Sequence, residues 1–362
     1  MTPMKIAVIS YGLPVEGAKR GGIERVAHTL AEGLARRGHR VVVFSHDPAP
    51  TSAAYEVREL PWKAFVNTWV GRRVTMGYLG NILALRVNLG DFDAVIAHGD
   101  SLLLAMGHTP FVRVMHGSAR GEALHATSVG RAVLQWGVYL QELLTAFVSP
   151  SRVIGISANT QRDNPFVRRI IPHGVDTTVF QPLPIGKSVH PSIVFVGAVE
   201  GRKRGGFLLD LFERAIRPAY PEAELMFVGP KGPSQPGVTY LTGVPDNDLA
   251  ALYRRAWVCA APSTYEGFGL PYLEAMACGT AVIATPNPGS REVLGDGYSG
   301  LVTDTEFAPA TLKVLADESR RRALEIAGIR RAAEFSIDRM IDQYEALLNE
   351  LRGSHARSVA SA

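Results

Sequence analysis

The sequence of 362 residues has few cysteines and no long apolar run. Its two cysteines, Cys259 and Cys278, lie in apolar surroundings, which excludes a disulfide framework and a cysteine-based metal site. No apolar run reaches about 18 residues, so no membrane-spanning helix is predicted. The first residues lead directly into the apolar stretch Ile6–Ile9, which is too short for a secretory signal. We therefore expect a protein that stays in the cytoplasm.

The charge balance is nearly even, but its distribution is not. Residues 1–180 hold 19 basic and 13 acidic residues, whereas residues 181–362 hold 19 and 21. The basic half would suit an acidic acceptor or peripheral contact with an anionic membrane surface, here the inner membrane face. A solvated, arginine-rich surface is the alternative. The chain also lacks a G-x-G-x-x-G motif with an acidic partner downstream, which counts against a Rossmann oxidoreductase.

The length and the 46% hydrophobic content predict two domains with separate cores. Strand and helix patterns alternate through both halves, which is typical of doubly wound α/β units. The expected strands are Lys5–Ser10, His39–Ser45, Asp93–His98, Phe111–His116, Val153–Ser157, Ile170–Ile171, Ser192–Val196, Glu224–Val228, Val258–Ala261 and Thr280–Ala284. The apolar stretch Leu134–Phe147 is expected to pack in a core or between domains. The segment Trp62–Val87 mixes aromatic and basic residues and is expected to be a core-facing helix, with membrane contact as the less favoured alternative.

One segment, Glu266–Gly279, carries more chemical information than any other. It places two carboxylates, Glu266 and Glu274, eight residues apart around a predicted helix start at Pro271. The loop Gly267–Leu270 feeds that helix, whose free N–H groups and dipole favour an anion such as a diphosphate. Acceptors on either side of a phosphate site suit an elongated ligand with hydroxyls at both ends, as in a nucleotide sugar.

This segment resembles the E-x7-E signature of the retaining glycosyltransferases of family 4, which have the GT-B fold. The resemblance continues through Gly279–Ala284 and Gly289–Leu294. It also includes the connector Pro172–Pro182, where the family usually has Pro-Asn-Gly-Val-Asp and this chain has His173 in place of the Asn.

The resemblance implies an α/β fold with two Rossmann-like doubly wound domains that face a central cleft. An N-terminal acceptor-binding domain would span residues 1–171, a linker 172–184, and a nucleotide-sugar-binding domain 185–335. A helix over residues 336–352 would cross back to the first domain, and a disordered tail would follow at 353–362.

The implied activity is transfer of a hexose from a UDP- or GDP-sugar to a saccharide, lipid-linked or small-molecule acceptor. The resemblance implies no cofactor and no metal, and Asp91-Phe92-Asp93 is interpreted as a turn before a strand rather than as a D-x-D metal motif. Nothing in the sequence indicates nucleic-acid binding. A binding protein that has lost turnover is the alternative.

The resemblance assigns candidate residues one by one. Glu266 would bind sugar hydroxyls, Glu274 the ribose diol, and His116 the donor sugar, with His98 as a weaker second candidate. The other donor-binding candidates are Gly21, Gly22, Val244, Gly267, Phe268, Gly269 and Leu270.

The chain departs from the family at the basic pair that meets the donor phosphates. Ala198 stands where relatives have Arg, and Arg204 stands where they have Lys. Arg204 is therefore a candidate catalytic residue, while Arg202 and Lys203 are candidate substitutes for the missing charge.

Overall fold

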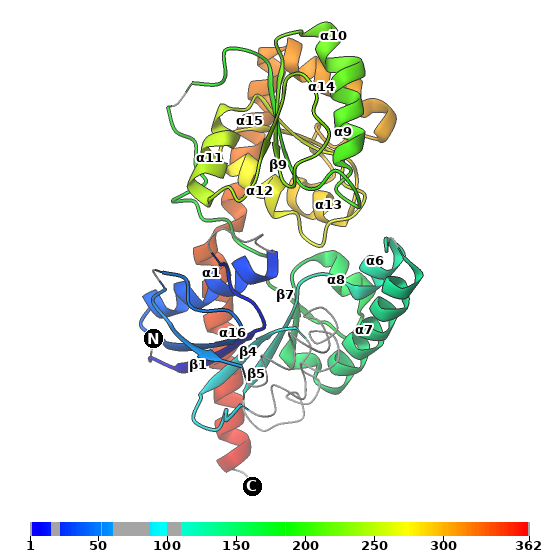
Figure 1. Ribbon diagram of the computed structural model, residues 1–362. Helices are drawn as coiled ribbons and strands as arrows, with labels where there is room; N and C mark the ends of the chain where they lie inside the picture. The colour runs from blue at the N-terminus through cyan, green and yellow to red at the C-terminus, as the bar shows by residue number, and fades with distance from the viewer. Residues whose placement is uncertain are drawn as a thin grey trace. The chain divides into compact units, whose positions relative to one another are not determined.

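The computed structural model describes residues 2–15, 22–51, 53–60, 87–99, 110–126, 128–184 and 186–360. The chain divides into two compact units (Figure 1). Unit 1 comprises Met1–His173 and Ile337–Ala362, and unit 2 comprises Gly174–Ser336. The predicted segment Trp62–Val87 lies, except for Val87, outside the described residues, as does Gly21.

Unit 1 is built on a parallel sheet of seven strands in the order β3-β2-β1-β4-β5-β6-β7. The strands are β1 (Lys5–Ser10), β2 (Arg40–Ser45), β3 (Glu56–Glu59), β4 (Ala94–His98), β5 (Phe111–Met115), β6 (Val153–Gly155) and β7 (Arg169–Ile170). Its helices are α1 (Gly22–Arg36), α6 (Ala119–Leu124), α7 (Val129–Val148), α8 (Ala158–Asp163) and α16 (Ile337–Ala360), with a short 3-10 turn η3 (Pro150–Arg152).

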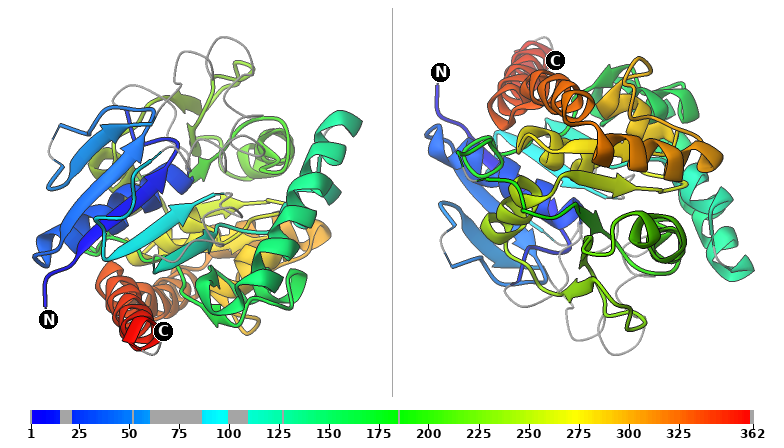
Figure 2. Two further views of the ribbon diagram at one scale, coloured as in Figure 1. Left: turned by 90° about the horizontal axis from the view of Figure 1, so that it is seen from below. Right: turned by 90° about the horizontal axis from the view of Figure 1, so that it is seen from above.

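Unit 2 is built on a parallel sheet of five strands in the order β10-β9-β8-β11-β12. The strands are β8 (Ser192–Val196), β9 (Glu224–Val228), β10 (Val238–Leu241), β11 (Val258–Ala261) and β12 (Ala281–Ala284). The helical elements are α9 (Gly205–Leu211), η4 (Phe212–Ile216), α10 (Arg217–Ala219), α11 (Asp246–Arg255), α12 (Leu270–Ala277), α13 (Pro288–Leu294), α14 (Asp304–Ala316), α15 (Glu318–Ala332) and η5 (Ala333–Phe335). Helices cover both faces of this sheet (Figure 2).

The central strands of both sheets are buried on both faces, as expected for parallel strands covered by helices. In unit 1, β1, β4 and β5 carry unbroken runs such as Ala94–His98, and in unit 2, β11 and β12 do the same. In each sheet the strand order reverses direction beside the first strand, between β1 and β4 and between β8 and β11. Ligands bind at the carboxyl ends of strands at such a reversal, so a ligand site is expected at the loops after β4, β8 and β11.

Two sequence expectations for the helices are wrong. The tail from residue 353 was expected to be disordered, but α16 continues to Ala360, because each further residue of an existing helix adds a backbone hydrogen bond. For Leu134–Phe147 the expected core packing is wrong: Trp136, Leu140, Leu144 and Phe147 are exposed, and the buried members of α7 are Glu142, Thr145 and Ala146. Among the described helices, none has both the length and the apolarity that spanning a bilayer requires.

Candidate active site

The loop before α12 is shaped by glycine at two positions where a side chain would not fit. Gly269 has φ of 100°, and a Cβ on it would lie 2.5 Å from Cδ2 of Tyr272. A Cβ on Gly289 would lie 2.7 Å from the carbonyl oxygen of Phe268. The loop therefore passes close against α13 and turns sharply into α12. Pro271 has no N–H, and the N–H groups of Tyr272 and Leu273 donate to the carbonyl oxygen of Gly269 at 3.0 and 3.4 Å. The positive end of the helix dipole still lies at this loop, which favours an anion there.

Glu266 lies at the end of the β11 loop and is held by two cations from the β8 loop. Its Oε2 accepts a hydrogen bond from Nη1 of Arg202 at 2.6 Å, and its Oε1 lies 2.6 Å from Nζ of Lys203. Arg202 also donates to the backbone oxygen of Tyr265 at 2.8 Å. Burial of Glu266 opposes its ionisation, but the charges and hydrogen bonds of Lys203 and Arg202 hold its pKa below the usual value for glutamate. The carboxylate is ionised, and the cluster carries one net positive charge.

Arg204 does not join this cluster, although the sequence placed it at the phosphate-binding position. Its guanidinium forms a bidentate pair with Asp304 at the start of α14, at 2.8 and 2.9 Å. The backbone of Arg204 has φ of 56°, a left-handed conformation that no other described non-glycine residue adopts. That conformation turns the side chain of Arg204 toward Phe207 and Asp304, whereas Arg202 and Lys203 turn toward Glu266.

Glu274 lies in the second turn of α12 and is 2% exposed. Its Oε2 accepts a hydrogen bond from the hydroxyl of Tyr253 on α11 at 3.3 Å. Val244 lies in the loop between β10 and α11, which also leaves the carboxyl edge of the unit 2 sheet, beside Gly243 at φ of 63°. Unit 2 thus gathers Arg202, Lys203 and Glu266 with residues 267–270 at the strand-order reversal.

In unit 1, three histidines form a chain of ring contacts. Nδ1 of His98, at the end of β4, lies 2.7 Å from Nε2 of His116, just after β5. Nδ1 of His116 lies 3.3 Å from Nε2 of His173. Burial lowers the pKa of His116 to about 3. Burial, and to a lesser extent the neighbouring imidazoles, also lowers the pKa values of His98 and His173. All three rings are neutral near pH 7.

The contacts with His98 and His173 occupy both ring nitrogens of His116. A neutral imidazole has one donor and one acceptor nitrogen, so each partner fixes which nitrogen of His116 carries the proton. A hydrogen bond from His116 to a sugar hydroxyl therefore requires the histidine chain to rearrange. His173 was noted in the sequence only as a replacement, and its contact with His116 was not anticipated. Gly22, also of unit 1, is the first residue of α1.

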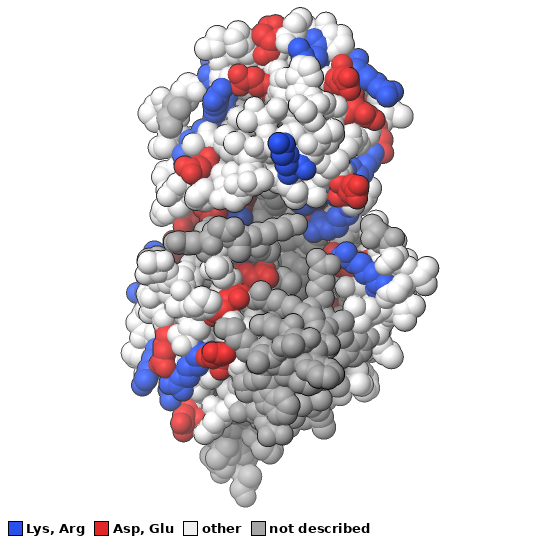
Figure 3. Space-filling view, viewed as in Figure 1, with Lys and Arg blue, Asp and Glu red and all other residues white. Residues whose placement is uncertain are grey.

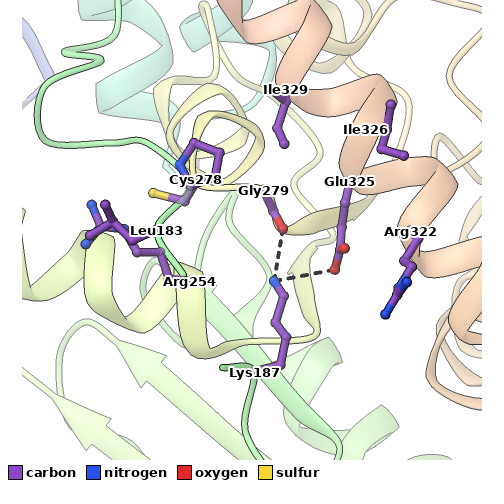
Figure 4. Close-up of a pocket in the computed structure, with 10 residues that line it drawn as sticks. Leu183, Lys187, Arg254, Cys278, Gly279, Arg322, Glu325, Ile326 and Ile329 are labelled. Atoms are coloured by element: carbon purple, nitrogen blue, oxygen red, sulfur yellow. Dashed lines mark hydrogen bonds and ion pairs between the residues drawn. The ribbon is translucent and has the colours of Figure 1, made fainter. Parts of the chain in front are cut away.

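A separate cavity in unit 2, of about 300 Å³, contains none of the predicted site residues. Lys187 lines it and donates to the backbone oxygen of Gly279 at 2.9 Å (Figure 4) and to that of Ala256 at 2.8 Å, which holds the C-terminal ends of α11 and α12 together. Glu325 lies 3.4 Å from its Nζ. Burial lowers the pKa of Lys187, and Glu325 partly opposes this.

Comparison with known families decides the assignment. The profile of the glycosyl transferases group 1 matches residues 190–317, and that of glycosyltransferase family 4 matches residues 20–179. The chain belongs to the family 4 (group 1) glycosyltransferases. Its fold is GT-B, with two Rossmann-like units, as the sequence predicted.

The relatives of this glycosyltransferase include several mannosyltransferases. It is 26% identical to the MMP alpha-(1->4)-mannosyltransferase of Mycolicibacterium hassiacum, over 89% of this chain and 94% of that protein. It is 28% identical to the phosphatidyl-myo-inositol mannosyltransferase of Propionibacterium freudenreichii, over 86% of this chain and 87% of that protein. Among solved structures, the sucrose-phosphate synthase of Thermosynechococcus elongatus superposes with a TM-score of 0.71 at 22% identity, covering 99% of this chain and 100% of that one.

Proposed function

We propose that this glycosyltransferase transfers a hexose from a nucleoside diphosphate sugar with retention of configuration and without a required metal ion. The observation that carries the proposal is the cluster of Arg202 and Lys203 with Glu266, beside the N-terminus of α12 at the strand-order reversal of unit 2. Departure of a diphosphate develops negative charge. Fixed cations and helix dipoles stabilise that charge without reorganising at the moment of reaction.

We propose distinct roles for the residues of unit 2. Arg202 and Lys203 supply the positive charge that the family usually draws from the position of Ala198, and they align Glu266 to bind sugar hydroxyls. Residues 267–270 bind the diphosphate, and Val244 and Glu274 bind the nucleoside. Arg204 acts as a positioning residue that does not contact the donor. Its bidentate pair with Asp304 orients the turn that carries Arg202 and Lys203.

For unit 1 we propose that His116 contacts the transferred sugar and that Gly21 and Gly22 lie near the donor phosphate. The acceptor is a saccharide, a lipid-linked molecule or another small molecule. A lipid-linked acceptor is supported by the phosphatidyl-myo-inositol mannosyltransferase among the relatives. A UDP-sugar donor is supported by an Anabaena structural neighbour, which was solved in complex with UDP and glucose.

The test is a panel of UDP- and GDP-hexoses, including GDP-mannose and UDP-glucose, with release of nucleoside diphosphate as the readout. Glycan, glycolipid and inositol-type acceptors are supplied in turn, with and without a chelator. We expect one donor to react, equally with and without chelator, and the product to keep the donor's anomeric configuration by NMR. Inversion, loss of activity with chelator, or binding without transfer across the whole panel would each contradict the corresponding part of the proposal.

A further inference from the structure

Helix α7 presents its apolar residues outward. Val129, Val133, Trp136, Leu140, Leu144 and Phe147 recur every three or four residues, which places them on one face of the helix. Val129 is 81% exposed and Leu140 is 68% exposed. The residues that α7 buries are Glu142, Thr145 and Ala146, which lie on the opposite face. We call the six outward residues the α7 stripe.

Burial within the described part of unit 1 does not account for this stripe. A monomeric soluble protein rarely exposes so long a row of large apolar side chains unless the row binds something. At 1.5 Å per residue, a helix of 20 residues is about 30 Å long. Helix α7 lies at the periphery of unit 1 (Figures 1 and 2), and this edge is mostly free of charged side chains (Figure 3).

The charges around the stripe are predominantly arginines. Residues 119–170 contain six arginines and three acidic residues. The acids are engaged: Glu142 is buried, Asp163 pairs with Arg120, and Glu122 pairs with Arg131. Arg169 pairs with Glu350 of α16, whereas Arg162 and Arg168 are exposed and form no ion pair within the described part of the chain. Ring contact between Phe147 and Phe166 brings the exposed segment that contains Arg168 beside the C-terminal half of α7.

We propose that the α7 stripe is a docking surface for an anionic lipid bilayer, with α7 lying in the interface and the flanking arginines contacting lipid phosphates. An apolar helix face with aromatic residues and a basic border is the pattern of interfacial binding. The charge selects lipid over a second copy of this chain, since a symmetric pair would place two basic borders against each other. The surface is independent of the nucleotide site, so this proposal stands or falls separately from the proposed transfer reaction.

The test is flotation of the full chain with two kinds of vesicle, phosphatidylcholine alone and equimolar phosphatidylcholine and phosphatidylglycerol. We expect binding to the mixed vesicles that weakens with salt, and much weaker binding to phosphatidylcholine alone. The double variant Val133→Glu/Leu140→Glu should lower the partition coefficient on mixed vesicles by about tenfold or more. The matched control, Val189→Glu/Ile326→Glu, changes exposed apolar residues of unit 2 and should leave binding unchanged.

A second variant separates lipid contact from misfolding. Arg162→Glu/Arg168→Glu leaves the apolar row intact and should lower binding to the mixed vesicles while removing its salt dependence. Circular dichroism checks that each variant keeps its helix content. Equal binding by wild type and both variants, or no binding by wild type, would overturn the proposal. So would a wild-type dimer that Val133→Glu/Leu140→Glu converts to a monomer, because the occupant would then be a second copy.

Discussion

Arg202, Lys203 and Arg204 are consecutive, yet the structure gives them different partners. We predict that Arg202→Ala or Lys203→Ala lowers kcat on the order of 100-fold with a smaller effect on nucleotide affinity, because their charge matters most as the diphosphate departs. Arg204→Ala should lower kcat less, since Asp304 already holds its guanidinium. Steady-state kinetics and nucleotide titration measure both. A loss below about threefold for Arg202 and Lys203, under about 0.7 kcal/mol, would refute the assignment.

The two glutamates of the E-x7-E pattern differ in their surroundings, and their variants should differ too. Glu266 is paired with two cations, whereas Glu274 of α12 accepts a hydrogen bond from the Tyr253 hydroxyl of α11. Glu274→Gln should weaken binding of free nucleoside diphosphate, and Glu266→Gln should chiefly lower turnover. Each lost charged hydrogen bond should cost about 1.5–3 kcal/mol. Equal effects of both variants on nucleotide affinity would argue against this division.

The buried histidines predict a pH dependence of stability. The pKa values of His98, His116 and His173 are lowered in the folded state, so the unfolded chain binds more protons below its ordinary histidine pKa of about 6.5. Their stabilising contribution is complete above about pH 6.5 and is lost as the pH falls toward the folded values. Denaturant titrations between about pH 7 and 5 should show that the free energy of unfolding decreases as the pH is lowered.

The control for this prediction is His190, which is exposed. His98→Asn should reduce the slope of unfolding free energy against pH, and His190→Asn should leave it unchanged. A slope that His98→Asn does not alter would show that the histidine chain is not its source.

At the scale of elements, α16 belongs to unit 1 although it follows unit 2 in the sequence. Glu345 of α16 is buried, and its carboxylate lies 2.9 Å from Nε2 of His39 and 2.7 Å from Nη1 of Arg37. Glu345→Ala would leave Nε2 of His39 without this acceptor, while Arg37 would keep its pairs with Asp338 and Asp342. The loss should destabilise unit 1 by about 1–3 kcal/mol. Glu350→Ala breaks the exposed pair with Arg169 and should cost under about 1 kcal/mol. Similar losses in denaturant unfolding would contradict the role given to Glu345.

At the scale of the whole molecule, each unit has its own core and its own sheet. A ligand that binds only folded unit 2 should stabilise that unit by mass action. UDP or GDP at about 100 times its dissociation constant should add about 2.7 kcal/mol to the free energy of unfolding of unit 2. A fluorescence melt with and without nucleotide measures the shift. The Glu274→Gln variant at the same nucleotide concentration is the control and should gain less.

The sequence by itself determined the fold class, the central strands and the family, because these depend on local patterns. Buried parallel strands such as Val258–Ala261 are continuous apolar runs, and the glycines and proline around α12 mark its ends. The edge strands β3 and β10 were missed, since Glu56–Glu59 and Val238–Leu241 are partly exposed and carry no such run. Edge strands are defined by the neighbour they pair with.

Only the tertiary structure decided which groups meet. The division of Arg202, Lys203 and Arg204 between Glu266 and Asp304 depends on one left-handed backbone angle, which spacing does not encode. The contact of His116 with His173 joins residues 57 apart. The outward direction of the α7 stripe was also beyond the sequence, because periodicity identifies an apolar face but does not say whether the fold covers it.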